Sequence, residues 1–148
     1  MKKNAEQKVY LIHGSPLSGK TTYVNKVSRP GDLIVDVDNI WQSISGCGRY
    51  DKPRELSGTV LKIYNMLVEM VKDRQGEWNN AYVICTEFSK KFAEKMCNEL
   101  NAEFIFLDTD KETCMKRLEE CGDGRSMDTW RNYINIFFNI NKGGLFNE

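Results

Sequence analysis

The sequence predicts an α/β fold, with a short parallel sheet of four to five strands in a three-layer α/β/α arrangement. Dense apolar runs alternate along the chain with segments whose apolar residues recur at helical spacing. Runs that are apolar at almost every position are typical of strands covered on both faces, as in a parallel sheet. The strand–helix alternation therefore predicts helices on both faces of that sheet.

The first three elements follow from local signals. We expect a strand at residues 9–13, an apolar run that ends at a glycine-rich turn. A helix is expected from Lys20, and Arg29-Pro30-Gly31 should end it. The second strand is expected at residues 33–37, which are β-branched or apolar apart from Asp36.

The middle of the chain is expected to hold an irregular segment, a helix and a strand. Gly46, Gly48 and Pro53 break regular structure, so residues 41–55 are expected to be irregular. A long helix should then run to about residue 74, and the third strand is expected at residues 81–85. The helix is indicated by apolar residues at helical spacing, which are Leu56, Val60, Ile63, Leu67 and Val71.

The last part of the chain is expected to add a strand between helices. The fourth strand is expected at residues 104–107, and Thr109 with Glu112 forms a capping box that should start the next helix. After a loop at residues 121–126 a final helix is expected, and no convincing fifth strand follows it. The helix before the strand should bury Phe88, Phe92, Met96 and Leu100, and the final helix Trp130, Tyr133, Ile134, Phe137 and Phe138.

Length and composition fit one domain spanning residues 1–148. Lys plus Arg and Asp plus Glu both number 21, so the formal net charge is zero, which disfavours a broad nucleic-acid footprint but allows a pocket for one strand end. The five cysteines contain no CxxC pair, and buried free thiols are expected rather than a metal site. The apolar run after Met1-Lys2-Lys3 is too short for a signal peptide, and no segment is long enough to span a membrane. We expect a soluble, cytoplasmic protein.

The most specific motif is GxxxxGK[ST] at residues 14–21, placed between a predicted strand and a predicted helix. Backbone N–H groups of such a loop and the N-terminus of the following helix bind polyphosphate. Lys20 is expected to reach the β- and γ-phosphates of a nucleoside triphosphate, and Thr21 to ligate Mg²⁺. The predicted nucleotide-binding residues of this segment are Gly14, Ser15, Pro16, Leu17, Ser18, Gly19, Lys20, Thr21 and Thr22.

Two further polar features lie at ends of predicted strands. His13, the only histidine, is interpreted as a packed or hydrogen-bonded residue rather than a general base. Asp36 and Asp38 are two apart, so in an extended segment both carboxylates would face the glycine-rich loop. One could hold Mg²⁺ and the other accept a proton from an incoming hydroxyl. The alternative is a solvated turn in which Asp38 caps a helix at Asn39.

Residues 9–22, followed by the Leu33–Asp38 run, resemble the small P-loop kinases, which include polynucleotide 5′-kinases, zeta-toxin-type kinases and shikimate and gluconate kinases. The chain is also similar to phage-encoded AAA-type predicted kinases that carry a comparable Gly-Asp-Leu-x-Val-Asp-x-Asp run. The likeness spans about residues 8–140 and implies a P-loop NTPase fold. Leu17 departs from the glycine often found in the family's loop, and the missing fifth strand is a second departure.

The resemblance also implies roles for individual residues. Asp38 would be the base that activates the acceptor hydroxyl, with Asp36 nearer the metal. The family has a lid arginine, which Arg125 in the segment 121–127 matches best, and Arg117 and Arg131 flank it. Arginine suits this role because its planar fork binds phosphate bidentately. Arg117 is assigned to the nucleotide and Arg131 to the substrate, although either could be a solvated surface residue.

The segment 41–54 is expected to lie over the acceptor side. Arg49 and Arg54, with Lys52, Tyr50 and Trp41, could hold a phosphate or stack a base, or they could form an ordinary surface loop.

The leading functional hypothesis is a kinase that moves the γ-phosphoryl of ATP or GTP, with Mg²⁺, to a hydroxyl of a nucleic acid 5′ end, a nucleoside or a nucleotide. The first alternative is a nucleotide-binding switch or ATPase acting on a protein partner, in which Glu87 would be the acidic residue beside the loop. The second is a small-metabolite kinase, because such a fold accommodates any compact hydroxyl compound.

Overall fold

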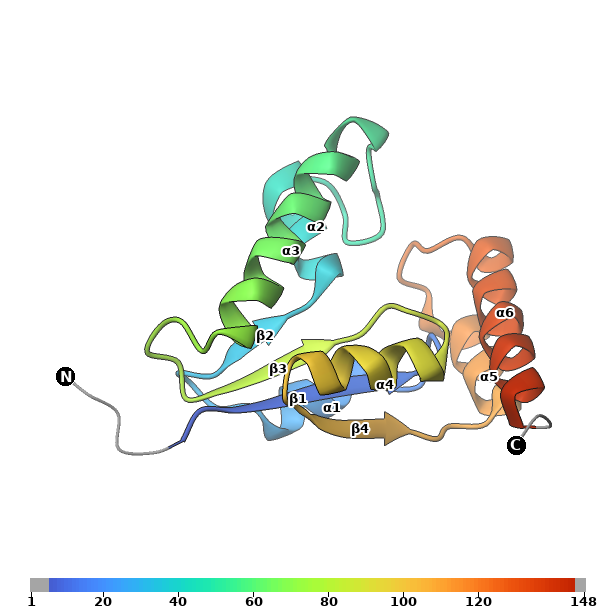
Figure 1. The fold of residues 1–148 in the computed structure, drawn as a ribbon. Coiled ribbons are helices and arrows are strands. Elements are labelled where there is room, and N and C mark those ends of the chain that lie inside the picture. The colour runs from blue at the N-terminus through green and yellow to red at the C-terminus, as the bar shows by residue number, and fades with distance from the viewer. Residues whose placement is uncertain (1–5, 146–148) are drawn as a thin grey trace.

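In the computed structural model of the chain, residues 6–145 are described, the last three of them by their backbone alone. Four parallel strands form one sheet in the order β2-β3-β1-β4 (Figure 1). The strands are β1 (Lys8–Gly14), β2 (Leu33–Val35), β3 (Asn80–Ile84) and β4 (Glu103–Leu107). The helices are α1 (Lys20–Val27), α2 (Val37–Ser45), η1 (Arg54–Leu56), α3 (Ser57–Lys72), α4 (Lys90–Glu99), α5 (Lys111–Cys121) and α6 (Met127–Leu145).

Helices cover both faces of the sheet, as the sequence predicts. On one face, α3 and α4 pack Val71, Ala93 and Cys97 against Leu11 and Val83 of the central strands. On the other face α1 contributes Val24 to a cluster that contains strand residues of β1 and β3. Figure 1 shows α4 in front of β1 and α1 behind it. The three-layer α/β/α arrangement is therefore confirmed, with a four-stranded sheet over the described residues.

The helices α5 and α6 form a hairpin beyond the carboxyl ends of the strands (Figure 1). Cys114 and Leu118 of α5 pack against Ile134 of α6, which confirms the apolar side predicted for the last helix. Leu17, from the loop after β1, packs against the same cluster. This contact ties the hairpin to the loop at the centre of the sheet edge.

The segment after β2 differs from the sequence prediction. The strand ends at Val35, and α2 occupies much of the stretch expected to be extended or irregular. Asp36 is the N-cap, because its side chain accepts a hydrogen bond from the Asp38 backbone N–H. Ile40 and Trp41 are buried against Val60 of α3. An aspartate cap followed by apolar residues at helical spacing thus outweighs the β-branched run that precedes it.

Two smaller predictions about helices are also wrong. Asp110, rather than Thr109, caps α5, and its side chain accepts a hydrogen bond from the Thr113 N–H. In α4 the buried residues are Ala93 and Cys97; of the predicted stripe, Leu100 is buried and Met96 packs against the core, but Phe92 is 50% exposed, so the stripe is wrong at Phe92. Of the five free cysteines, Cys85, Cys97 and Cys114 are buried, Cys121 is half-buried and Cys47 is exposed. No described helix combines the length and apolarity that crossing a membrane requires.

His13 is fully buried at the end of β1, which confirms its interpretation as a packed residue. Its ring lies beside Phe104, Phe106 and Phe137, with centroids 6.0, 5.7 and 5.5 Å away. The Nε2–H donates to the Glu87 carbonyl at 2.8 Å, so Nε2 carries a proton. Burial lowers the pKa of His13 to about 4.

Protonation of His13 should therefore destabilise the fold in acid. Its folded-state pKa lies below its ordinary value, so the unfolded chain binds the proton first as the pH falls. The free energy of unfolding should decrease between about pH 6.5 and pH 4, by on the order of 3 kcal/mol from this group. Urea unfolding of the wild type and His13→Gln across this range measures the effect. Equal pH slopes for the two proteins would contradict it.

Candidate functional site

The loop after β1, residues 14–19, is called the glycine loop here. It turns tightly, with the Ser18 N–H donating to the Ser15 carbonyl at 2.9 Å, and runs directly into α1. Leu17 and Gly19 adopt left-handed φ angles of 66° and 102°. Leu17 would be strained there, but the packing of its side chain on the α5–α6 hairpin offsets the strain. This contact explains a leucine at the tip of the loop.

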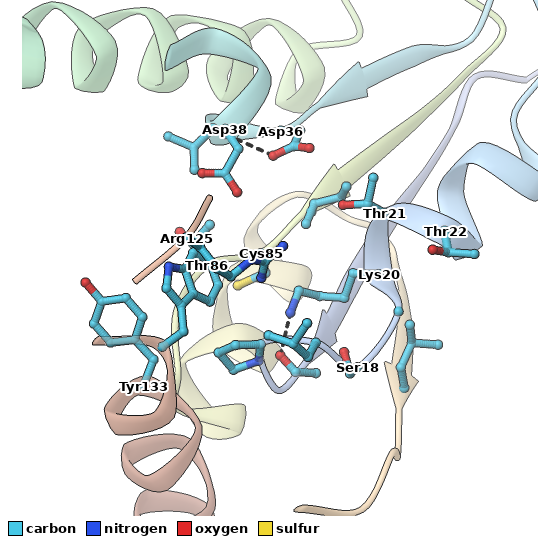
Figure 2. Close-up of a pocket in the computed structure, with 18 of the residues that line it drawn as sticks. Ser18, Lys20, Thr21, Thr22, Asp36, Asp38, Cys85, Thr86, Arg125 and Tyr133 are labelled. Carbon is cyan, nitrogen blue, oxygen red and sulfur yellow. Dashed lines mark hydrogen bonds between the residues drawn. The ribbon is translucent and has the colours of Figure 1, made fainter. Parts of the chain in front are cut away.

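The Lys20 amine points back into the glycine loop (Figure 2). Its Nζ donates to the carbonyls of Gly14 and Ser15 at 2.8 and 2.9 Å. Burial lowers the pKa of Lys20 to about 8, although attraction from groups that include Asp38 and Asp36 opposes this shift. The Lys20 amine is thus close enough to the carboxylates of Asp36 and Asp38 to interact with them electrostatically.

The surroundings of the loop leave several donors directed at that space. The N-terminus of α1 has no side-chain cap, so its first backbone N–H groups have no partner within the helix. The Ser18 hydroxyl is buried and has no hydrogen-bond partner among the described residues. Arg117 of α5 donates to the Leu17 carbonyl at 3.0 Å and lies beside the loop. This arrangement can bind an anion with several negative oxygens.

The two aspartates lie opposite the glycine loop but differ in geometry. Asp36 is only 3% exposed, and its oxygens accept hydrogen bonds from the Asp38 N–H at 3.0 Å and from Arg49 Nη2 at 2.8 Å. Asp38 lies in the first turn of α2 and pairs with Lys52 Nζ at 3.0 Å. The expectation of two carboxylates on one extended segment is wrong, because the chain turns into α2 at Asp36. Both residues nevertheless face the same cavity.

Arg125 extends from the α5–α6 loop into the cavity, on the side away from Thr21 and Thr22 (Figure 2). Asp123 binds its guanidinium, with the shortest contact at 2.7 Å, and these hydrogen bonds hold the pKa of Asp123 below its ordinary value. Its Nη2 also donates to the Tyr50 hydroxyl. The guanidinium lies over the rings of Tyr50 and Trp130, 4.2 and 4.3 Å from their centroids. Contacts with Asp123 in its own loop and with Tyr50 in the loop after α2 thereby hold Arg125 in place.

These residues enclose a cavity of about 940 Å³ at the carboxyl ends of the strands. In Figure 2, Arg125 and Tyr133 lie toward one side, Thr21 and Thr22 toward the other, and Lys20 between them. Of the residues that the sequence singles out, the cavity is lined by Gly14, Pro16, Leu17, Ser18, Gly19, Lys20, Thr21, Thr22, Asp36, Asp38, Arg49, Tyr50, Lys52, Arg117 and Arg125.

Other candidates lie elsewhere. Arg131 pairs with Asp128 at 3.1 Å, and Arg54 is exposed in η1; neither lines the cavity. Trp41 is buried in the packing of α2 on α3, so it is not available to stack a base. Glu87 is exposed and does not line the cavity. The described residues contain no group of three or more His, Cys, Asp or Glu side chains able to hold a metal ion.

Sequence reasoning assigned no ligand-binding role to several residues that line the cavity, among them Thr86, Phe88, Trp130 and Tyr133. Trp130 and Tyr133 have the spacing of an apolar helix stripe, and that spacing alone does not separate a core side chain from a cavity wall. Thr86 follows β3 at the sheet edge where ligands bind in parallel α/β folds, which was the available signal.

The fold is similar to chains of two solved structures. One belongs to the Pnkp1/Rnl/Hen1 RNA repair complex, with a TM-score of 0.66 and 16% identity over 97% of this chain and 48% of that chain. The other belongs to a Pnkp1/Rnl/Hen1 complex, with a TM-score of 0.55 and 18% identity over 78% of this chain and 42% of that chain. This chain spans about half the length of the chains it matches. No family model and no curated protein matches the sequence.

Gly14 should be intolerant of any side chain. A Cβ at this position would lie 2.6 Å from the Ser18 Oγ and 2.9 Å from the Leu107 carbonyl, and the carbonyl belongs to the backbone of β4. Gly14→Ala should lower the free energy of unfolding by about 1–3 kcal/mol, because the loop or strand must shift. Urea unfolding measures this. The matched control is Gly58→Ala, where a Cβ meets nothing within 4 Å. Equal stability of the two variants would contradict the prediction.

Proposed function

We propose that this protein is a phosphotransferase that moves the γ-phosphoryl group of ATP or GTP to a hydroxyl of a nucleic acid 5′ end, a nucleoside or a nucleotide. The observation that carries the proposal is the joint placement of Lys20, the first residue of α1, and of Asp38 on one cavity. A cation that can hold transferring phosphate and a carboxylate that can take a proton are both required for this reaction.

The glycine loop fits a triphosphate. The buried Lys20 amine has only neutral carbonyls as hydrogen-bond partners, and the nearby Ser18 hydroxyl is unpaired among the described residues. Phosphate oxygens would satisfy both groups together with the uncapped N-terminus of α1. Arg117 would reach the nucleotide from α5, and Arg125 from the α5–α6 loop. The cavity is also large enough for a nucleotide and a second substrate.

Mg²⁺ would accompany the nucleotide. Thr21 supplies a hydroxyl at the cavity, and Asp36 would bind the ion through water, since both its oxygens already accept hydrogen bonds. When bound, the ion would neutralise charge on the β- and γ-phosphates.

Asp38 would serve as the general base. The acceptor oxygen bonds to the γ-phosphorus, the bond from that phosphorus to the β–γ bridging oxygen breaks, and the nucleoside diphosphate leaves with the electron pair. The hydroxyl proton passes to Asp38, which must first separate from Lys52. Lys20 and Arg125 would offset the negative charge of the transferring group. Likeness to a chain of an RNA repair complex supports a nucleic-acid acceptor among the hydroxyl compounds.

Asp38→Asn should separate binding from transfer. The amide cannot accept the proton, so phosphoryl transfer should fall by about 10²–10⁴-fold, while the Kd for ATP or GTP stays the same. Transfer of labelled γ-phosphate to a panel of 5′-hydroxyl DNA and RNA, nucleosides, nucleotides and sugars measures the first quantity, and calorimetry the second. Asp51→Asn, which changes an exposed carboxylate in the loop after α2, is the matched control and should keep full transfer. Wild-type transfer by Asp38→Asn would refute this mechanism.

Nucleotide affinity should fall as the pH rises through about 8, where the free protein loses the charge of Lys20. A bound polyphosphate raises the pKa of Lys20, so binding above this pH takes up a proton and weakens by about tenfold per pH unit. Calorimetry in two buffers of different ionisation enthalpy measures the uptake directly. Lys20→Arg keeps its charge and should show no uptake. A flat affinity profile for the wild type would contradict the role given to this amine.

A further inference from the structure

Four aromatic rings form a continuous series along one wall of the cavity. Phe88 lies 5.7 Å from Tyr133, Tyr133 lies 5.5 Å from Trp130, and Trp130 lies 5.3 Å from Tyr50, measured between ring centroids. They come from the segment after β3, from α6 and from the loop between α2 and η1. All four line the cavity and are half-buried. This set is called the aromatic wall below.

The aromatic wall differs from the packing core of the same helix. Ile134 and Phe137 of α6 are 0% and 3% exposed and lie against the α5 cluster and His13. Trp130 and Tyr133, on the adjoining side of α6, keep part of their surface toward the cavity. Rings that served only to fill the interior would not need to line an open space. The exposed part of the wall is therefore available to a ligand.

Cations lie among the rings. Arg125 is placed over both Tyr50 and Trp130, and the Arg49 guanidinium lies 5.9 Å from the Tyr50 centroid. Aromatic faces next to arginines are the combination with which proteins bind unpaired nucleic acid, since each base stacks on a ring while cations attract the phosphates. An aliphatic metabolite, which has no flat face to stack, would gain little from four rings in series.

The position of the wall assigns it to the acceptor rather than to the nucleoside triphosphate. Tyr50 belongs to the same loop as Arg49 and Lys52, which pair with Asp36 and Asp38. The wall thus begins beside the proposed base, where the accepting hydroxyl must lie. Figure 2 shows Tyr133 and Arg125 on the side of the cavity away from Thr21 and Thr22 of α1. The phosphates of the donor need Lys20 and the N-terminus of α1, so they would lie on the α1 side, away from the aromatic wall.

We propose that the aromatic wall is a nucleobase subsite that stacks the terminal base of an unpaired 5′-hydroxyl polynucleotide. This inference rests on the proposed function, because it places the accepting hydroxyl beside Asp38, and it narrows the acceptor to a base-bearing strand end. The rings line the wall of a cavity, and a base must leave its own partner to enter it, so a blunt duplex end is a poor ligand. Tyr133 is the residue that best reports this subsite, since no described contact joins it to an arginine.

Equilibrium binding without any nucleoside triphosphate tests the subsite apart from catalysis. The ligands are a 3′-labelled 5′-hydroxyl oligonucleotide, the same strand with an abasic terminal residue, and a blunt duplex, followed by fluorescence anisotropy. For the wild type the intact unpaired strand should bind about 5- to 100-fold more tightly than the abasic strand, the range expected for one stacked base. Comparing two ligands on the wild-type protein makes this step independent of any folding defect in a variant.

Tyr133→Leu should reduce the preference for the intact strand, and Tyr133→Phe, which keeps a ring, should retain it. Phe92→Leu is the matched control, because Phe92 is an exposed aromatic residue on α4 outside the cavity. Equal wild-type affinity for intact and abasic strands would overturn the inference. So would a Tyr133→Leu protein with weakened ATP or GTP affinity and unchanged strand preference, because the wall would then hold the base of the donor.

Transfer of labelled phosphate to the same ligands separates the two proposals. Base-selective binding of the strand, without phosphorylation of the strand or of any other hydroxyl compound of the panel, refutes the phosphotransferase and leaves the base-stacking subsite intact. Phosphorylation of intact and abasic strands with equal kcat/KM refutes the subsite and leaves the phosphotransferase intact.

Discussion

The burial of the Lys20 amine at the carboxyl edge of the sheet is the constraint on which the rest of the site depends. The half-buried ammonium group donates to two backbone carbonyls, and its partial loss of water lowers its pKa to about 8. Carbonyl dipoles offset only part of the cost of burying a charge, so the site favours an anion with several oxygens. The central position of β1, between β3 and β4, brings the other strand ends around this amine.

Asp36 and Asp38 show how one short acidic run supports two different tasks. Asp36 is buried, starts α2 and binds Arg49, so it fixes the helix and the loop that follows. Asp38 lies in the first turn of α2 and pairs with a partly exposed lysine side chain, Lys52, which can move away at small cost because surface ion pairs are weak. Asp36 is therefore held by its partners, whereas Asp38 can be released from Lys52. Asp38 is the better suited of the two to accept a proton.

The strands and the glycine loop could be predicted because their signals are local: an apolar run, then glycines and a lysine at fixed spacing. The start of α2 could not, since the β propensity of residues 33–37 competes with an aspartate cap whose value depends on the packing of Ile40 and Trp41. The sequence alone could not show which arginines line the cavity. Arg49, Arg117 and Arg125 reach the cavity, whereas Arg131 pairs with its helix neighbour Asp128.

Several contacts join the α5–α6 hairpin to the rest of the site. Leu17 and Arg117 connect it to the glycine loop through apolar packing and a hydrogen bond to the backbone. Toward the loop that carries Arg49 and Lys52, a main connection is through Arg125 and its contacts with Tyr50. In the proposed reaction Arg125 would also meet the transferring phosphoryl, so phosphate would compete with Asp123 for the same guanidinium. If donor phosphate bound Arg125, the contacts between Arg125 and Tyr50 of the aromatic wall would therefore change as well.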